Sequence, residues 1–193
     1  MGKYFRPSWD DYFMAIAKIV GTRGTCDRLR AGAVLVKDKR IISTGYNGAP
    51  PELGHCDDIG HLMEEGHCVR TIHGEHNAIL QAAVLGGIST VGSTLYTLYN
   101  PCIHCAKYVV MAGVKRVVIG QIYRGEKALE YLKKAGLEIE SYKPSSEWDQ
   151  NLLKLFSAEI EKVEAKEGNV KLVEDSNKID DLNIVQPNQT VAL

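Results

Sequence analysis

The chain is predicted to fold as an α/β domain in which helices cover a central sheet. Between residues 74 and 142, helix-like and strand-like segments alternate, which is typical of crossover connections in such folds. Two β-branched runs and an amphipathic segment precede this alternation. The chain has 193 residues, 45% hydrophobic and 24% charged, which is the composition of a globular protein that buries its own core.

The first element is predicted to be a helix over residues 8–21. A serine at its start, two aspartates in its first turn and a glycine at its end suit these positions. Two strands follow, over 32–37 and 40–46, and the short polar turn between them predicts a hairpin. Residues 47–71 sustain no hydrophobic period and are rich in Gly, Pro, His and Cys, so we expect a long functional loop there.

The later elements follow one another at short, regular spacing. They are predicted to be helices over 74–85, 102–112 and 126–135, and strands over 93–99, 115–120 and 137–142. A last helix is expected from Ser146 to Ala165, and the polar remainder has too few apolar residues for a core of its own. We therefore expect a catalytic domain over residues 1–144 and a helix with a polar tail over 145–193.

Charge and hydropathy narrow the classes of partner. The formal net charge is −1, from 23 basic and 24 acidic residues, so no overall field would attract nucleic acid, and we do not expect a nucleic-acid partner. No apolar run approaches the roughly 18 residues that span a bilayer, and the first residues lack the apolar region of a secretory signal. We expect a cytoplasmic protein without a membrane partner.

The cysteines and histidines cluster in one part of the sequence. All six histidines lie between residues 55 and 104, together with four of the five cysteines. Cytosolic reductants keep thiols free, so such a cluster indicates metal binding rather than disulfides. The full set is Cys26, Cys56, Cys68, Cys102, Cys105, His55, His61, His67, His73, His76 and His104.

Two short motifs carry the predicted chemistry: His73-Gly74-Glu75 and Pro101-Cys102-Ile103-His104-Cys105. The two cysteines are three positions apart at a predicted helix start, so both sulfurs face one side, and the helix dipole favours their thiolate forms. One imidazole and two thiolates leave the fourth position of a tetrahedral zinc open, as in catalytic sites. Glu75 is placed to exchange protons with a water at that position.

The combination H-x-E followed by P-C-x-x-C is the signature of zinc nucleobase deaminases. The chain resembles the deoxycytidylate (dCMP) deaminase family of the cytidine deaminase superfamily, including its bacterial late-competence-type members. The resemblance covers about Ser8 to Ser141. It is carried by SWDDYFMA (8–15), TCDRLRAGAVLV (25–36), GYNGAP (45–50), HCDD (55–58), GHCVRTIHGEHNAI (66–79) and PCIHC (101–105). One departure is Gly74, where the family usually has alanine.

The resemblance implies a three-layer α-β-α cytidine deaminase-like fold with a five-stranded mixed sheet, whose last two strands are parallel. It implies a homo-oligomer, with a hexamer favoured. The implied reaction is hydrolysis of dCMP to dUMP and ammonia, which supplies dUMP for dTMP synthesis. Zinc would be held by His73, Cys102 and Cys105, with Glu75 as the proton shuttle.

Substrate and effector contacts are also implied by the resemblance. Asn77 would hold the deoxyribose, and Arg28 with Tyr123-Arg124 would bind the 5′-phosphate; the alternative for either arginine is a solvated surface side chain. Gly45-Tyr46-Asn47-Gly48 would bind the effectors dCTP and dTTP, accompanied by Mg²⁺, although Asn and Gly also suit a plain turn.

A second, structural zinc is a further expectation from the resemblance. Its predicted ligands are Cys26, Cys56, His61 and His67, with Cys68 or His55 as replacements. The alternative is that these cysteines pack as small hydrophobic side chains.

Two other functions compete with dCMP deamination. A tRNA adenosine deaminase shares both motifs, and zinc chemistry alone does not separate attack on cytosine from attack on adenine. The other is a zinc-stabilised binding module for DNA uptake, which would have no need of Glu75.

Overall fold

The structure is a computed structural model that describes residues 6–123, 125–145 and 148. The chain divides into two compact units, residues 1–149 and 150–193, and all described residues belong to the first. Apart from Trp148, the helix predicted from Ser146 and the polar tail lie outside the described residues, and the predicted domain boundary stays a prediction. Within the described part of the chain, no helix combines the length and apolar character that a membrane span requires.

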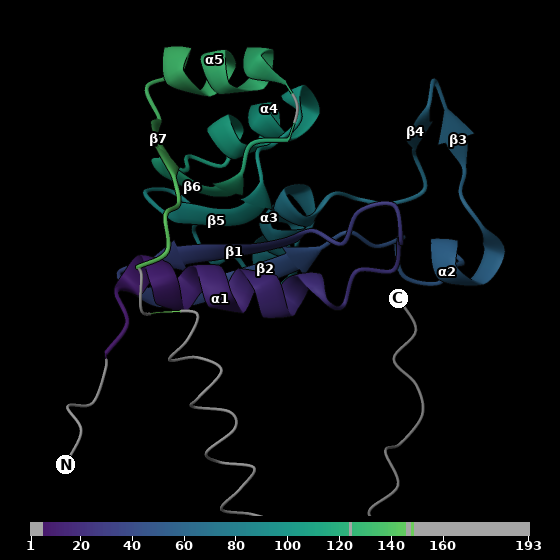
Figure 1. The fold of residues 1–193 in the computed structure, drawn as a ribbon, viewed down its shortest axis with the longest axis horizontal. Helices are drawn as coiled ribbons and strands as arrows, with labels where there is room; N and C mark the ends of the chain where they lie inside the picture. The colour runs from purple at the N-terminus through teal and green to yellow at the C-terminus, as the bar shows by residue number, and fades with distance from the viewer. Residues whose placement is uncertain (1–5, 124, 146–147, 149–193) are drawn as a thin grey trace, which may run out of the picture. The chain divides into compact units, whose positions relative to one another are not determined.

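A five-stranded mixed sheet forms the middle layer, in the order β2-β1-β5-β6-β7 (Figure 1). β1 pairs antiparallel with β2 and β5, whereas β5–β6 and β6–β7 are parallel, which confirms the predicted parallel pairing of the last two strands. The strands are β1 (Gly32–Lys37), β2 (Arg40–Tyr46), β5 (Thr94–Tyr99), β6 (Arg116–Gln121) and β7 (Glu138–Ser141).

Helices cover both faces of the sheet, so the predicted three-layer α-β-α fold is confirmed. α1 (Trp9–Gly21) covers one face, where Phe13 and Met14 pack against Val34 and Tyr96. Three helices cover the other face, where Leu35, Leu95 and Ile119 meet their apolar sides (Figure 1). These helices are α3 (Gly74–Val84), α4 (Ile103–Met111) and α5 (Glu126–Lys134).

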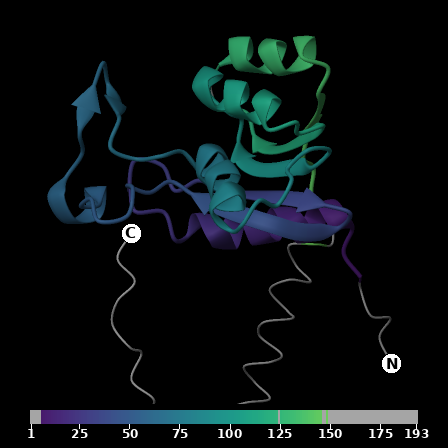
Figure 2. The same cartoon turned by 180° about the vertical axis from the view of Figure 1, so that it is seen from behind.

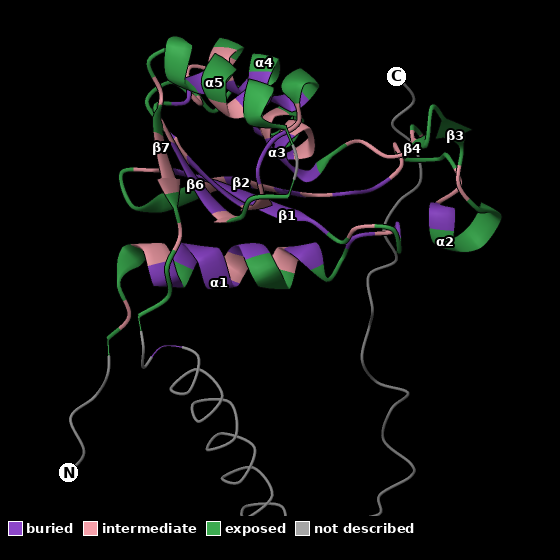
Figure 3. Cartoon of the chain, turned by 45° about the horizontal axis from the view of Figure 1, so that its top comes forward, coloured by how far each residue is buried: buried purple, intermediate pink, exposed green. Residues whose placement is uncertain are grey.

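The side chains of each inner strand alternate between the two faces of the sheet, so one sheet contributes to two hydrophobic cores. Successive side chains of a strand point to opposite faces, so Leu35 joins the core under α3, α4 and α5 while Val34 and Val36 join the core under α1. The inner strands are consequently buried on both faces (Figure 3).

The segment 47–71, predicted as one long loop, contains three short elements. They are α2 (Cys56–Ile59), β3 (Met63–Glu64) and β4 (His67–Cys68). Elements of two to four residues are too short to show a hydrophobic period, so no pattern in the sequence predicts them. Together they form a lobe beside the sheet, which Figures 1 and 2 show from opposite sides. We call residues 55–70 the cysteine lobe.

An ion-pair network joins α1 to the strands β6 and β7. The Arg116 guanidinium donates to both carboxylate oxygens of Asp10, at 3.0 and 2.8 Å, and also to both oxygens of Glu140. The Tyr96 hydroxyl donates to Asp10 at 2.6 Å. The hydrogen bond from Arg116 is the main cause that lowers the pKa of Asp10 below its ordinary value of 3.8.

Replacing Asp10 by asparagine tests this network. Because the pKa of Asp10 is lowered in the folded protein, its carboxylate stabilises the fold above about pH 3.8, and this contribution is lost as the pH falls through the folded-state pKa. We expect Asp10→Asn to lower the free energy of unfolding by about 1 kcal/mol at neutral pH, a value reduced for the partial exposure of the pair.

Urea unfolding at neutral and strongly acidic pH measures the effect. The difference from the wild type should vanish in acid, and Asp38→Asn is the control, because Asp38 lies in the exposed β1–β2 turn at a positive φ that asparagine tolerates. A difference that does not change with pH would contradict the proposed role of the carboxylate.

Candidate functional site

Three predicted zinc ligands meet where the first residues of α3 and α4 approach each other. His73 is the N-cap residue of α3 and Cys102 that of α4. The His73 Nδ1 atom lies 3.6 Å from the Cys102 sulfur and 3.5 Å from the Cys105 sulfur. Tetrahedral zinc, with Zn–S near 2.3 Å and Zn–N near 2.0 Å, would separate nitrogen and sulfur by about 3.5 Å. The three side chains therefore fit one zinc ion.

The turn after β2 holds α3 in this position. The Asn47 side-chain oxygen accepts a hydrogen bond from the Gly74 amide at 2.8 Å, and its side-chain nitrogen donates to the Leu29 carbonyl at 3.0 Å. A Cβ atom at Gly45 would lie 2.2 Å from the Ala78 nitrogen, so only glycine allows α3 to pack this closely on β2. Gly45 and Asn47, predicted as part of an effector site, here support the metal ligands.

The electrostatic environment favours a cation at the three ligands. A hydrogen bond with the Cys105 thiol is the main cause that lowers the pKa of Cys102 to about 3. The same contact raises the pKa of Cys105, and the neighbouring Cys102 sulfur raises the pKa of His73. Metal binding requires deprotonated thiols, so a cysteine with a lowered pKa is suited to bind a divalent cation.

Glu75 is buried beside the ligands, with 6% of its surface exposed. Burial is the main cause that raises the pKa of its carboxyl, and it interacts with the Cys105 thiol. Both Glu75 and His73 line the same cavity. The carboxyl is therefore placed beside the metal ligands without belonging to their set, as the sequence predicts for a proton shuttle.

The cavity that contains these groups has a volume of about 720 Å³, within the range of small-molecule sites. The aromatic rings of Tyr99 and Tyr123 contribute to its wall and meet edge to face at 5.9 Å. Basic side chains also line it: Arg28, His67 and Lys127. The arrangement suits a planar, anionic ligand.

The predicted substrate residues are only partly brought together. Arg28 and Tyr123 line the cavity, and the Arg28 guanidinium donates to the Gly66 carbonyl at 3.1 Å. Arg124 lies outside the described residues. Asn77 is not among the described residues that line the cavity, and its side-chain nitrogen donates to the Tyr46 carbonyl at 3.0 Å. Residues that are two positions apart in an α-helix point about 200° apart around its axis. The side chains of Glu75 and Asn77 on α3 therefore point in nearly opposite directions.

A second group of candidate ligands joins the cysteine lobe to the loop before β1. The ligand atoms of Cys26, Cys56, His61 and Cys68 all lie within 4.8 Å of one another. The Cys56 and Cys68 sulfurs are 3.5 Å apart, and the Cys26 sulfur is 3.8 Å from His61 Nδ1. The other ring nitrogen of His61 lies 3.1 Å from the Asp27 carboxylate, the partner that metal-bound histidines usually have.

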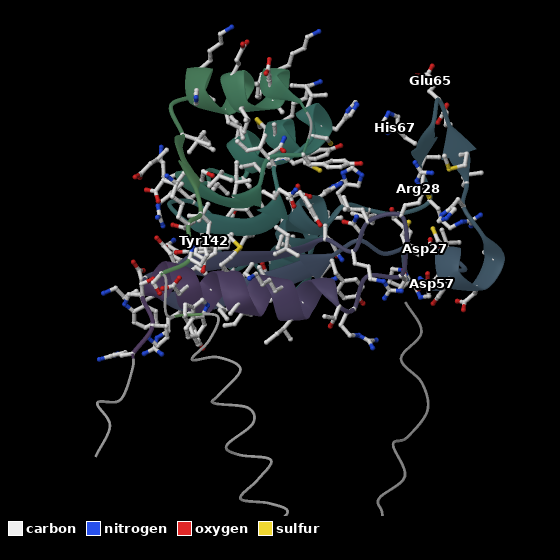
Figure 4. All side chains as sticks on the ribbon, in the orientation of Figure 1. Asp27, Arg28, Asp57, Glu65, His67 and Tyr142 are labelled. Carbon is white, nitrogen blue, oxygen red and sulfur yellow. The ribbon has the colours of Figure 1, made fainter. Side chains whose placement is uncertain are left out.

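The four-residue group corrects one predicted ligand, because Cys68 stands where the sequence favoured His67. Neighbouring residues of a strand point to opposite sides, so β4 directs Cys68 to Cys26, Cys56 and His61 and turns His67 away from them, although both residues line the cavity. Figure 4 shows His67 extending from the lobe toward the body of the domain. His55, the other replacement, lies instead with its Nδ1 3.1 Å from the Thr25 hydroxyl.

Comparison with known proteins identifies the family. Residues 7–121 match the model of the cytidine and deoxycytidylate deaminase zinc-binding region, which includes both groups of candidate ligands. The chain belongs to this family of zinc-dependent deaminases. Zinc is accordingly the metal for which the His73, Cys102 and Cys105 side chains are suited.

Individual relatives agree with this assignment. The chain is 44% identical over 136 residues to ComE operon protein 2 of Bacillus subtilis, covering 70% of this chain and 71% of that protein. It is 37% identical over 151 residues to the deoxycytidylate deaminase of Saccharomyces cerevisiae, covering 74% of this chain but only 47% of the yeast protein. The dCMP deaminase of cyanophage S-TIM5, solved in complex with dCMP and dUMP, superimposes with a TM-score of 0.63 at 29% identity, over 72% of this chain and all of that one.

Lys127 is a cavity residue that the sequence did not single out. It lies in the first turn of α5, just after Gly125, whose φ of 88° turns the chain into the helix. The one sequence signal for Lys127 is its position at the start of the helix that follows β6. A helix that follows a parallel strand begins at the carboxyl edge of the sheet, where ligand-binding sites form in α/β folds.

Proposed function

We propose that the protein is a zinc-dependent hydrolase that converts dCMP to dUMP and ammonia. The observation that carries the proposal is the buried Glu75 beside His73, Cys102 and Cys105, in a cavity of nucleotide size that is lined by basic and aromatic side chains. The names of the relatives support cytosine deoxynucleotides as the substrate class. The dUMP formed in this reaction would be used for dTMP synthesis.

In the proposed reaction, three residues bind the metal and Glu75 transfers protons. His73, Cys102 and Cys105 would hold zinc, which would supply the Lewis-acid chemistry that makes water nucleophilic near neutral pH. Glu75 would accept a proton from the attacking water and donate it to N3 of the cytosine, while the water oxygen forms a bond to C4 and the N3–C4 double bond becomes single. It would then take the remaining proton of the oxygen now bonded to C4 and pass it to the amino group, so that the C4–N bond breaks, ammonia leaves and C4 becomes the carbonyl carbon of dUMP. Burial raises the pKa of Glu75, which suits a carboxyl that must carry a proton between these atoms.

Replacing Glu75 by glutamine tests the proton shuttle. Because general acid–base catalysis contributes about 10²- to 10⁴-fold, we expect Glu75→Gln to lower kcat with dCMP by at least this range while the zinc content stays unchanged. Ammonia release and metal content measure the two effects. The matched control is Glu126→Gln, which changes an exposed carboxylate on the wall of the same cavity.

The same assay separates the competing functions. Wild-type protein is offered dCMP, dCTP, cytidine and tRNA in parallel. Turnover of tRNA without turnover of dCMP would favour the adenosine deaminase, and no turnover at all by zinc-loaded protein would favour the binding module. Unchanged kcat in Glu75→Gln would refute the role given to this carboxyl.

The 5′-phosphate is proposed to lie near Arg28, in the cavity that Lys127 and His67 also line, with Tyr123-Arg124 as further ligands. A guanidinium suits forked contacts with phosphate oxygens. The deoxyribose contact of Asn77 stays a prediction, and it would require the Asn77 side chain to leave the Tyr46 carbonyl.

An Arg28→Gln variant tests the phosphate site. Hydrogen bonds to charged groups contribute about 1.5–3 kcal/mol, so we expect KM for dCMP to rise roughly 10- to 100-fold and the rate with deoxycytidine, which has no phosphate, to change little. Steady-state kinetics with both substrates measures this. Arg23→Gln is the control, because Arg23 is an exposed cation that does not line the cavity. Equal losses with both substrates would contradict the assignment.

A second, structural zinc is also proposed, with Cys26, Cys56, His61 and Cys68 as its ligands. Four protein ligands leave no position for water, which is typical of structural zinc. The group joins two segments distant in sequence, since Cys26 precedes β1 and the other three belong to the cysteine lobe.

Metal counting tests this site. We expect two zinc ions per chain in the wild type, one in Cys56→Ser with a lowered thermal midpoint, and two in His67→Ala. Atomic spectroscopy of dialysed protein, with unfolding followed by circular dichroism, gives the measurement. Two ions in Cys56→Ser, or one in His67→Ala, would show that the ligand set is wrong.

Allosteric effectors, a cellular compartment and an oligomeric state are also proposed for this protein. Binding of dCTP or dTTP with Mg²⁺ at Gly45-Tyr46-Asn47-Gly48 would act on catalysis directly, because Asn47 holds the Gly74 amide next to His73. A cytoplasmic setting is proposed because thiolate ligands must stay reduced. A homo-oligomer, with a hexamer favoured, is proposed from the family resemblance.

A further inference from the structure

Strands β5 and β6 run side by side and then separate at the edge of the sheet that carries the cavity. Their parallel pairing ends with Tyr99 opposite Gln121. Beyond this pair, β5 continues into Pro101-Cys102 and α4, whereas β6 continues through residues 122–125 into α5. Helices that follow parallel strands begin at the same carboxyl edge of the sheet. The metal ligands at the start of α4 and the first residues of α5 therefore lie on one side of the domain, where the two helices pack together (Figure 1).

The segment between β6 and α5 has little hydrophobic burial to hold it in place. Ile119 and Ala128 are each 1% exposed. Between them, every residue that the structure describes is exposed except Gly120, which is partly buried. Yet this segment and the first turn of α5 contribute Tyr123 and Lys127 to the wall of the cavity. Their position must therefore come from contacts other than the burial of neighbouring side chains.

Asn100 provides such contacts. It is 8% exposed and directly precedes the motif Pro101–Cys105. Its main-chain N–H donates to the Gln121 carbonyl at 3.2 Å, and its side-chain oxygen accepts a hydrogen bond from the Tyr123 N–H at 2.7 Å. A Cβ atom at Gly125, the N-cap residue of α5, would lie 3.9 Å from the Asn100 side-chain nitrogen. The buried amide thus extends the contact between the two strands beyond the point where their pairing ends.

We propose that Asn100 is a positioning residue that sets the preference of the cavity for a phosphorylated ligand. The segment it holds contains Tyr123 and Arg124 and leads into Lys127, all of which belong to the phosphate site proposed above. The inference rests on that part of the proposed function. Asn100 acts through this segment rather than by touching the phosphate.

Holding the segment in advance favours binding because its freedom is already lost. An exposed segment that becomes ordered only when a ligand binds lowers the affinity by the cost of ordering it. The hydrogen bond from the Tyr123 N–H to Asn100 reduces this cost. The base of the ligand would lie beside Glu75 and the metal ligands, which other elements position. Loss of the Asn100 amide should therefore weaken the binding of a nucleotide more than that of a nucleoside.

Isothermal titration calorimetry of the full-length, zinc-loaded protein with dUMP and with deoxyuridine tests the proposal. We expect the wild type to bind dUMP more tightly than deoxyuridine, and Asn100→Ala to weaken dUMP binding about 10-fold with little change for deoxyuridine. Thr97→Val is the control. It removes another buried hydrogen bond near the end of β5, from the Thr97 hydroxyl to the Tyr99 carbonyl at 2.9 Å, and it should keep the wild-type preference.

Gly125→Ala disturbs the same segment from its other end. The φ of Gly125 is 88°, which strains an alanine, but no atom lies closer than 3.9 Å to the added Cβ, so the change introduces strain without a clash. We expect the same selective loss of dUMP binding. Gly136→Ala is the matched control, because Gly136 lies beyond the other end of α5 with a φ of 82° and open space around its Cβ position. It should keep the wild-type preference.

The proposal is overturned if the wild type binds dUMP no more tightly than deoxyuridine, or if Asn100→Ala or Gly125→Ala keeps the wild-type preference or weakens both ligands equally. A selective loss as large in either control variant would also overturn it. Circular dichroism and zinc content show whether a variant is folded. If Asn100→Ala is not, Asn100→Ser replaces it, since serine stays polar but its shorter side chain loses the contact with Tyr123.

Turnover of dCMP is measured separately, so the two failures are distinguishable. A protein that prefers dUMP through Asn100 but does not deaminate dCMP would support this inference and contradict the proposed reaction. A protein that deaminates dCMP and keeps its preference for dUMP in Asn100→Ala would do the opposite.

Discussion

The approach of two helix starts is the constraint on which the rest of the structure depends. His73 and the Cys102–Cys105 pair are about 30 positions apart in sequence, yet the imidazole nitrogen lies 3.5–3.6 Å from both sulfurs. This distance requires α3 to lie tightly on β2, where Gly45 leaves room and Ser43 donates a hydrogen bond to the Ala78 carbonyl. It also requires β5 to end where α4 begins. Once these conditions hold, the turn of α3 directs Glu75 inward beside the ligands.

The cysteine lobe forms another part of the cavity lining, and it contains most of the second group of candidate metal ligands. Cys26 lies two residues before Arg28, and Cys68 directly follows His67, so a metal bound by the cluster of Cys26, Cys56, His61 and Cys68 would fix the backbone next to two basic side chains of the cavity. A metal at this cluster would therefore influence substrate binding without touching the substrate. The catalytic ligands and the phosphate-binding wall would then be held by separate groups of side chains.

Sequence reasoning succeeded where a pattern is local and failed where it depends on how distant segments meet. The helices and strands of the sheet have clear periods because each has one face in a core, and Cys-x-x-Cys at a helix start fixes its own geometry. The choice between His67 and Cys68 depends on the direction of a two-residue strand, which no period reveals. The orientation of Asn77 depends on how α3 is rotated against β2. The place of Lys127 in the cavity lining depends on the whole crossover from β6 to α5.

Anomalous diffraction at the zinc absorption edge, from crystals of the full-length protein, tests the central claim most directly. The predicted result is a peak bonded to His73 Nδ1 and to the sulfurs of Cys102 and Cys105, with the Glu75 carboxylate nearby but not bonded to the ion. A peak bonded to Glu75, or no peak among these three side chains in a crystal that contains zinc elsewhere, would contradict the account.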